Sequence, residues 1–343
     1  MTRVLHVLPH RGGGAETYID LLERLDGFEH ERVALSRGRT PLSAATSLPR
    51  GYPAIARAAA GADLVHAHGD VAALLALPLL RRSPSVVTTH GLHFLRRTRG
   101  ARLAAAQRGF RVVARSAGCI VCTSAAERDE LAALLGPELS ARLAVVHNGV
   151  DVRPPDPGAV ARAELGLGEE VVVLFLGELE ARKAPLVAVA AARRAAADGA
   201  PLVLLVAGDG PQAEAVRAWS SSVVRPLGFR RDPERLLAAA DIFVLPSERE
   251  GLSFAVLEAM AAGLTMVVSD GPGNPEAVGD AGVVVPVGDV AALADALGEL
   301  ALDQARRERL GASARERVRA QFSVEQMLGG VAAAYAAALE RHR

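Results

Sequence analysis

Several kinds of residue are scarce in this sequence of 343 residues, and each scarcity excludes a class of protein. Aromatic residues make up 3% of the chain, and they are not interleaved with arginine as on nucleic-acid-binding surfaces. No apolar run reaches the roughly 18 residues that cross a membrane. The opening segment, M-T-R-V-L-H-V-L-P, is typical of a short strand and not of a secretory leader. We therefore expect a cytoplasmic chain with no nucleic-acid partner.

Cysteine is scarce too, with two residues in the whole chain. Cys119 and Cys122 form a C-x-x-C pair, which can be a redox or zinc motif. A second pair of ligands is missing from the sequence, and the surrounding run A-G-C-I-V-C is typical of a buried strand. We interpret both thiols as small core residues, which suits a reducing compartment.

The formal net charge is zero, but the two halves of the chain differ in sign. Residues 1–150 contain 19 arginines and 12 acidic residues, whereas residues 151–343 contain 20 basic and 27 acidic residues. This imbalance indicates that the two halves bind different partners.

Short β-branched runs alternate with longer stretches rich in alanine and leucine, which indicates parallel βαβ units. The expected strands are Val4–Leu8, Arg32–Leu35, Leu64–His66, Ser85–Thr88, Cys119–Cys122, Leu143–Val146, Val171–Leu176, Leu202–Ala207, Val223–Pro226, Ile242–Leu245, Thr265–Val268 and Gly282–Val285. The series is interrupted at residues 147–158, where Asn-Gly, three prolines and a final glycine have linker chemistry. The sequence thus predicts an α/β protein with two doubly wound, Rossmann-like domains, residues 1–150 and 151–323. A terminal helix at 324–343 should pack back on the first domain.

Ligands of doubly wound sheets bind where the strands end, and the most informative motif lies there. Residues 245–263 read L-P-S-E-R-E-G-L-S-F-A-V-L-E-A-M-A-A-G, which predicts a strand end, a polar turn and a helix from about Leu252 to Ala262. The unpaired amides of the first helical turn suit a diphosphate. Glu250 before the helix and Glu258 within it can accept hydrogen bonds from sugar hydroxyls. Without further context, the two glutamates could equally be a helix cap and a solvated side chain.

This stretch resembles the signature of glycosyltransferase family 4, the retaining transferases of the GT-B fold, in which two such domains face each other across a cleft. The resemblance implies that Glu258 binds the ribose of a nucleotide-sugar donor. It implies that Glu250 contacts the donor sugar, and that the amides of Leu252 and Ser253 bind phosphate or sugar.

Lys183 is the only lysine among 39 strongly basic residues. A compact ammonium group is suited to phosphate as a point charge, and Lys183 follows a predicted strand in F-L-G-E-L-E-A-R-K-A. By the resemblance, an arginine and then a lysine hold the diphosphate here, and Lys183 matches the lysine. Glu178 occupies the usual position of the arginine, so Arg182 is the candidate for the second phosphate contact.

Further positions carry the resemblance with weaker motifs. In the first half, the glycine turn H-R-G-G-G-A-E implies a donor contact at Gly13 and Gly14 and an acceptor-side position at Glu16. His90, after a strand, would contact the transferred sugar, and His68 in H-A-H-G would line the acceptor side. The H-x-H pair could bind a metal only with a third ligand.

In the second half, A-G-D-G-P implies a donor-binding turn at Gly208. Gly228 and Phe229 would wall the base, and the segment Gly273–Glu276 would complete the donor side.

The resemblance implies transfer with retention and without a metal or another cofactor, since the sequence has no D-x-D motif. The donor would carry UDP or GDP, and the leaving phosphate would take the acceptor's proton. The acceptor could be a carbohydrate, a lipid-linked group or a small molecule. Two alternatives stay open: a nucleotide-sugar isomerase or epimerase of the same fold, and a degenerate protein that binds a nucleotide sugar without turnover.

Seven arginines and no acidic residue lie between His93 and Arg115, with apolar residues interspersed. This stretch is either a solvated basic helix face or a peripheral contact with anionic lipid at the inner face of the membrane. In the second interpretation, Leu95, Leu103 and Phe110 would enter the lipid interface.

Overall fold

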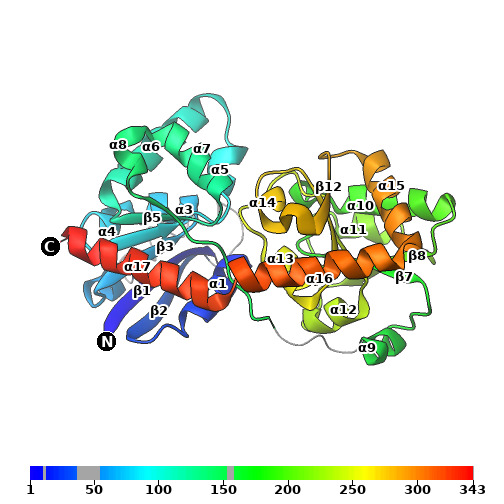
Figure 1. Cartoon of the computed structure of the whole chain (residues 1–343). Helices are drawn as coiled ribbons and strands as arrows, with labels where there is room; N and C mark the ends of the chain where they lie inside the picture. Colours follow the sequence, from blue (N-terminus) through cyan, green and yellow to red (C-terminus); the bar gives the residue numbers. More distant parts are fainter. Residues whose placement is uncertain (11–12, 37–54, 153–157, 343) are drawn as a thin grey trace. The chain divides into compact units, whose positions relative to one another are not determined.

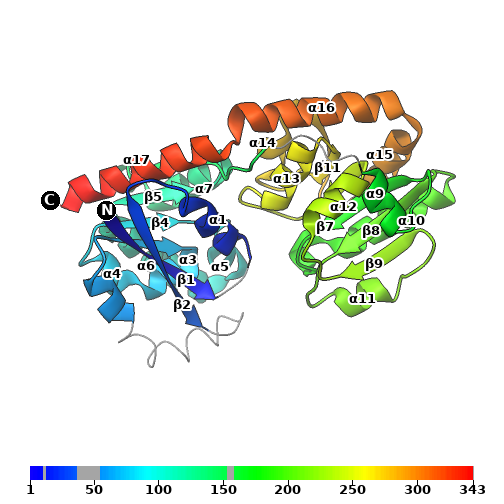
Figure 2. The ribbon, with the colours of Figure 1, turned by 90° about the horizontal axis from the view of Figure 1, so that it is seen from below.

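The computed structural model describes residues 1–10, 13–36, 55–152 and 158–342. The chain divides into two compact units (Figure 1). The first comprises Met1–Asn148 and Val324–Arg343, and the second comprises Gly149–Ser323. The last helix, α17 (Val324–His342), therefore belongs to the first unit although it follows the second along the chain (Figure 2).

The first unit is built on a parallel sheet of six strands in the order β2-β1-β3-β4-β5-β6. These strands are β1 (Thr2–His10), β2 (Phe28–Ser36), β3 (Leu64–His68), β4 (Ser85–Thr88), β5 (Cys119–Cys122) and β6 (Leu143–Val145). Its helices, besides α17, are α1 (Gly14–Leu22), α3 (Asp70–Leu75), α4 (Leu77–Leu80), α5 (His93–Arg97), α6 (Gly100–Ser116), α7 (Ala125–Leu135) and α8 (Pro137–Ser140).

The second unit has its own parallel sheet in the order β12-β11-β10-β7-β8-β9. The strands are β7 (Val171–Leu176), β8 (Leu202–Ala207), β9 (Val224–Gly228), β10 (Ile242–Leu245), β11 (Thr265–Ser269) and β12 (Gly282–Val285). The helices are α9 (Ala159–Glu164), η1 (Ala181–Lys183), α10 (Pro185–Ala197), α11 (Ala213–Arg217), α12 (Pro233–Ala239), α13 (Phe254–Ala262), α14 (Asn274–Val278), η2 (Gly279–Ala281), α15 (Val290–Leu302) and α16 (Gln304–Gln321).

The α/β class and the two doubly wound sheets are as the sequence predicts, and every predicted strand is present. Helices cover both faces of such sheets, so interior strands such as Leu202–Ala207 are apolar throughout and buried at every position. For this reason, the strands can be predicted from short apolar runs in the sequence. The helix predicted from about Leu252 begins two residues later, at Phe254. The reason is that Ser253, the N-cap, has an extended backbone conformation with φ −72° and ψ 124°, so the helical conformation begins after it.

Two glycines let the loops that follow neighbouring strands of the second unit approach closely. A Cβ atom at Gly208 would lie 1.8 Å from the carbonyl oxygen of Gly177, and one at Gly273 would lie 2.1 Å from that of Gly251. Both glycines have positive φ angles, 149° and 90°, which other residues rarely adopt. The loops at the carboxyl ends of β7 and β8, and of β10 and β11, are therefore packed backbone to backbone.

Candidate functional site

Two polar clusters occupy the carboxyl ends of the strands, one in each unit. In the second unit, the chain leaves β7, forms the short 3₁₀ helix η1 and enters α10 through Ala184, whose φ angle is 52°. A left-handed conformation at alanine is strained, and such strain is common at functional sites. It lies directly beside Arg182 and Lys183, the two basic residues predicted to hold a diphosphate.

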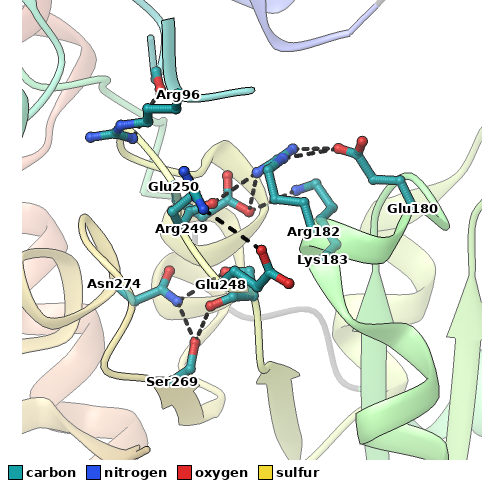
Figure 3. A network of polar contacts seen from close by, with 11 residues as sticks. Arg96, Glu180, Arg182, Lys183, Glu248, Arg249, Glu250, Ser269 and Asn274 are labelled. Atoms are coloured by element: carbon teal, nitrogen blue, oxygen red, sulfur yellow. Dashed lines mark hydrogen bonds and ion pairs between the residues drawn. The ribbon is translucent and has the colours of Figure 1, made fainter. Parts of the chain in front are cut away.

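Both basic side chains are paired with buried carboxylates (Figure 3). Oε1 of Glu250 lies 3.1 Å from Nη1 of Arg182 and 3.3 Å from Nζ of Lys183. Oε1 of Glu180 accepts hydrogen bonds from Nη2 and Nε of Arg182 at 2.6 and 3.1 Å. All four side chains are less than 20% exposed. The cluster is thus charge-balanced and mostly shielded from water, so each pairing is stronger than it would be on the surface.

The turn that carries Glu250 is fixed from several sides. The amide of Glu248 donates to the carbonyl oxygen of Arg182, and the amide of Glu250 donates to that of Pro272, both at 2.8 Å. Asn274, which is 1% exposed, donates through Nδ2 to Oγ of Ser247 at 3.0 Å and to Oγ of Ser269 at 3.1 Å (Figure 3). These bonds tie the loops after β7, β10 and β11 to one another. The second unit therefore holds Arg182, Lys183 and Glu250 in a preformed arrangement.

Glu258 lies on α13, which begins after the same turn. Burial raises the pKa of its carboxyl to about 7, and the nearby charge of Glu234 adds to the shift. The side chain of Leu252 is in the core and not at the surface of the site. Ser253 is the N-cap of α13, and its side chain makes no capping hydrogen bond.

The remaining predicted donor residues of this unit follow β8 and β9. Gly208 is required by the close approach to Gly177, so its identity has a structural reason whatever its role in binding. Phe229 directly follows β9 and is 70% exposed. A large exposed aromatic ring is available for stacking on a flat ligand.

In the first unit, the loop after β4 carries His90. Its φ angle is 50°, and that of Leu92 is 51°. Two buried carboxylates hold this strained loop. Glu127 accepts from Oγ1 of Thr89 at 2.7 Å and from the amide of Gly91, and Oδ2 of Asp70 accepts from the amide of Leu95 at 2.8 Å. Burial raises the pKa of both carboxyls, that of Asp70 to about 6.

His90 and His68 are brought together, with 3.0 Å between Nε2 of His90 and Nδ1 of His68. His68 also bonds to His6, and burial lowers the pKa of all three rings, that of His90 to about 3. Among the described residues, His6, His66 and His68 are close enough to share a metal ion. However, each of their six ring nitrogens already has a hydrogen-bond partner: two are shared between His6 and His68, and the other four bond to His30, His90, Tyr335 and Thr88.

The glycine turn lies at the start of α1, with Gly13 as the N-cap at a φ angle of 87° and Gly14 as the first helical residue. Arg11 and Gly12 lie outside the described residues. Glu16 is in the first turn of α1. Two residues further, Tyr18 packs edge-on against His90, with 4.9 Å between ring centroids. The turn and the His90 loop are therefore joined through Tyr18.

The arginine-rich stretch forms α5 and α6, and the predicted insertion of Leu95 and Phe110 into a lipid interface is wrong. Leu95 is 6% exposed and Phe110 is fully buried, so neither side chain can enter a lipid interface. Arg96 is ion-paired with Glu130 and donates to the carbonyl oxygen of Gly91. The other six arginines are exposed: Arg97, Arg99, Arg102, Arg108, Arg111 and Arg115. Over the part of the chain that the structure describes, no helix is long and apolar enough to span a membrane.

Cys119 and Cys122 are free and buried, as the sequence predicts. Four site residues were not predicted: Glu180, Asp70, Glu127 and His6. Only Glu127 has a recognisable motif, S-x-x-E from Ser124, which marks the start of α7. None of the hydrogen bonds, ion pairs and ring contacts described above involves Glu16 or Phe229.

Comparisons with known proteins assign the class. Residues 11–153 match the family model for Glycosyltransferase Family 4, and residues 170–303 match that for Glycosyl transferases group 1. The fold and these matches define a glycosyltransferase of the GT-B fold. The chain belongs to glycosyltransferase family 4.

Curated relatives cover most of this chain. It is 32% identical over 295 residues to a glycogen synthase of Mycobacterium tuberculosis, covering 82% of this chain and 70% of that protein. It is 31% identical over 306 residues to an alpha-maltose-1-phosphate synthase of the same species, covering 78% and 77%.

Among solved structures, sucrose-phosphate synthase from Thermosynechococcus elongatus has a TM-score of 0.83 at 22% identity, covering 98% of both chains. Anabaena Alr3699/HepE, in complex with UDP and glucose, has a TM-score of 0.81 at 18% identity and covers 98% of this chain and 100% of that chain. At these identities, the likeness concerns the fold.

Proposed function

We propose that this glycosyltransferase moves a sugar, with retention and without a metal ion, from a UDP- or GDP-linked donor to an acceptor hydroxyl. The observation that supports the donor half is the preformed cluster of Arg182, Lys183 and Glu250. Two shielded cations beside a helix start, in a chain without a D-x-D motif, offer the neutralisation that a metal would otherwise supply.

In the free protein, both cations face the carboxylate of Glu250. A donor diphosphate would compete for Arg182 and Lys183, and would leave Glu250 free to accept hydrogen bonds from the sugar. As the bond to the sugar breaks, the same cations would stabilise the charge that develops on the leaving diphosphate. That leaving group would take the acceptor's proton, so no side chain is assigned as general base. His90 would contact the transferred sugar, with Glu258 on the ribose and Phe229 beside the base.

Relatives and neighbours support a nucleotide-sugar donor but differ in its base. HepE was crystallised with UDP-glucose, and a relative that is 34% identical over 225 residues is named as a GDP-mannose-dependent mannosyltransferase. The acceptor class is supported only by names such as glycogen synthase, which favour a carbohydrate. Free buried thiols support a cytoplasmic location.

The test is calorimetric titration of UDP and GDP in the presence of a chelator, with wild type and Lys183→Ala. We expect one nucleotide to bind wild type, and Lys183→Ala to bind it about 10- to 150-fold more weakly, because a charged hydrogen bond is worth about 1.5–3 kcal/mol. Arg217→Ala, which removes an exposed cation of the same unit, is the matched control and should bind like wild type. Binding that requires an added divalent cation, or that is unaffected by Lys183→Ala, would contradict the proposal.

A further inference from the structure

Four imidazole rings in the first unit form one continuous hydrogen-bonded chain. Nδ1 of His30 lies 2.8 Å from Nε2 of His6, Nδ1 of His6 lies 2.9 Å from Nε2 of His68, and Nδ1 of His68 lies 3.0 Å from Nε2 of His90. The rings come from β2, β1, β3 and the loop after β4, which are neighbours in the sheet. The chain therefore crosses the sheet from one strand to the next.

The two inner rings of this chain, His6 and His68, are shielded from water, whereas the two outer rings, His30 and His90, are shielded only in part. His6 and His68 are 0% and 1% exposed, whereas His30 and His90 are partly exposed. Burial lowers the pKa of His6, His68 and His90 far enough to keep these rings neutral at physiological pH, and it also lowers that of His30. A neutral imidazole has one N–H donor and one nitrogen acceptor.

Proton counting leaves only two arrangements that satisfy all three bonds. If His6 donates from Nδ1 to His68, its Nε2 must accept from His30, and His68 must in turn donate from Nδ1 to His90. All four protons then lie on Nδ1, and reversing any one bond forces all four onto Nε2. The tautomer of His90 is thus tied to that of His30, three hydrogen bonds away.

The far end of the chain favours one of these arrangements. Nε2 of His30 is buried and has no hydrogen-bond partner among the described residues. A buried N–H group without an acceptor is rarer and costlier than an unused acceptor. The arrangement with every proton on Nδ1 leaves a lone pair at this nitrogen, so it is the favoured one.

We propose that His30, His6 and His68 are positioning residues that hold His90 as the Nδ1–H tautomer, so that His90 presents a neutral N–H donor from Nδ1 to the sugar. This inference rests on the proposed function for the contact between His90 and the sugar, but the state of the chain can be measured without a substrate. Free histidine prefers the opposite tautomer, with its proton on Nε2, so the predicted state is distinctive.

The direct test is nuclear magnetic resonance of the full-length protein labelled with ¹⁵N-histidine, because long-range couplings distinguish Nδ1–H from Nε2–H. At neutral pH, we expect His6, His30, His68 and His90 all to carry the proton on Nδ1. An Nε2 proton on any of the four would overturn the proposal, as would a ring that is charged. Zinc that copurifies in stoichiometric amount would overturn it too, because a metal on these rings would replace the shared protons.

Variants separate positioning from packing. His6→Phe interrupts the chain, and His66→Phe is the matched control, because His66 is an equally buried neighbour that bonds to Tyr335 and Thr88 instead. We expect His90 to become a mixture of tautomers in His6→Phe and to stay Nδ1–H in His66→Phe. If His6→Phe does not fold, His30→Phe at the partly exposed end should also give a mixture. An unchanged His90 tautomer in the interrupted variant would contradict the idea.

In the transfer assay, His6→Phe should lower kcat and kcat/KM together, by about tenfold, as losing an orienting partner does. His66→Phe should retain the wild-type values. Equal losses in both variants would assign the effect to packing and overturn the positioning role. If wild type transfers no sugar at all, the proposed function fails, whereas the resonance test still decides the state of the chain.

Discussion

Lowering the pH from about 7.5 to about 5.5 is expected to destabilise the first unit of this protein while stabilising the second. In the first unit, burial lowers the pKa of His6, His66 and His68 well below the ordinary value of 6.5, and that of His90 to about 3. The folded state keeps these rings neutral, whereas the unfolded chain takes up protons near pH 6.5. Because the unfolded state binds more protons, the free energy of unfolding falls as the pH drops through that value.

The size of this effect follows from the number of rings. Each ring that stays neutral in the folded state costs about 1.4 kcal/mol between these two pH values, or about 5 kcal/mol for the four. Asp70 opposes this, because burial raises its pKa to about 6, so the folded state gains a proton and about 0.8 kcal/mol of stability. Glu127 acts in the same sense as Asp70. The net loss, about 3–4 kcal/mol, is a large part of a typical domain's stability.

The second unit should respond with the opposite sign. Burial raises the pKa of Glu258 to about 7. Between about pH 7.5 and pH 5.5, Glu258 therefore takes up a proton in the folded state, whereas in the unfolded chain it stays ionised. We therefore expect the second unit to be more stable at pH 5.5 than at pH 7.5, in the absence of nucleotide.

Urea unfolding followed by two probes separates the units. Trp219 is the only tryptophan in the sequence and lies in the second unit, so its fluorescence reports that unit, whereas far-ultraviolet circular dichroism reports both. Acidification should move the dichroism transition of the first unit to lower urea, and should not lower that of the fluorescence. In His66→Phe, the pH-dependent loss of stability that comes from histidine should be smaller by about a quarter. Equal midpoints at both pH values, or a loss confined to fluorescence, would refute the reasoning.

Three further predictions concern binding surfaces. The nucleotide affinity of wild type should fall as the pH drops below about 7, because the carboxylate of Glu258 takes up a proton. Glu258→Gln should bind nucleotide more weakly, and its affinity should not depend on pH in this range. If Glu258→Gln keeps the pH dependence of wild type, the ribose contact is excluded. Phe229→Ala should lose about 1–3 kcal/mol of nucleotide binding free energy if the exposed ring stacks on the base, whereas Phe229→Tyr should not; calorimetry measures both. The exposed Arg108 and Arg111 should give salt-sensitive binding to anionic vesicles. Charge reversal at both positions should reduce this binding without changing nucleotide affinity. If wild type does not bind anionic vesicles at low salt, α6 is only a solvated helix face.

The strands could be predicted because each is a short apolar run between helices, and several, such as Ser85–Thr88, have the predicted bounds. Lys183 could be singled out by its scarcity alone. The structure adds that Arg182, beside it, is held by Glu180 and Glu250. That arrangement depends on side-chain directions after β7, which sequence spacing does not determine.

The imidazole chain could not be predicted for a different reason. The sequence indicates His68 and His90 as separate site residues, whereas His6 is the single polar residue of the predicted strand Val4–Leu8. What brings them together is strand order and register: His6 lies opposite His66 across β1 and β3, and His68 lies opposite Thr88 across β3 and β4. Register between strands far apart in the sequence is set by the packed sheet.

The central claim is that this family 4 enzyme transfers a sugar with retention and without a metal. The most direct measurement is proton resonance of the product anomer, with chelator-treated protein, the nucleotide sugar whose base binds in calorimetry, and a carbohydrate acceptor. The account predicts a product with the anomeric configuration of the donor, formed at the same rate with or without chelator and much more slowly by Lys183→Ala. An inverted product, or turnover that returns only when magnesium or manganese is added, would contradict it.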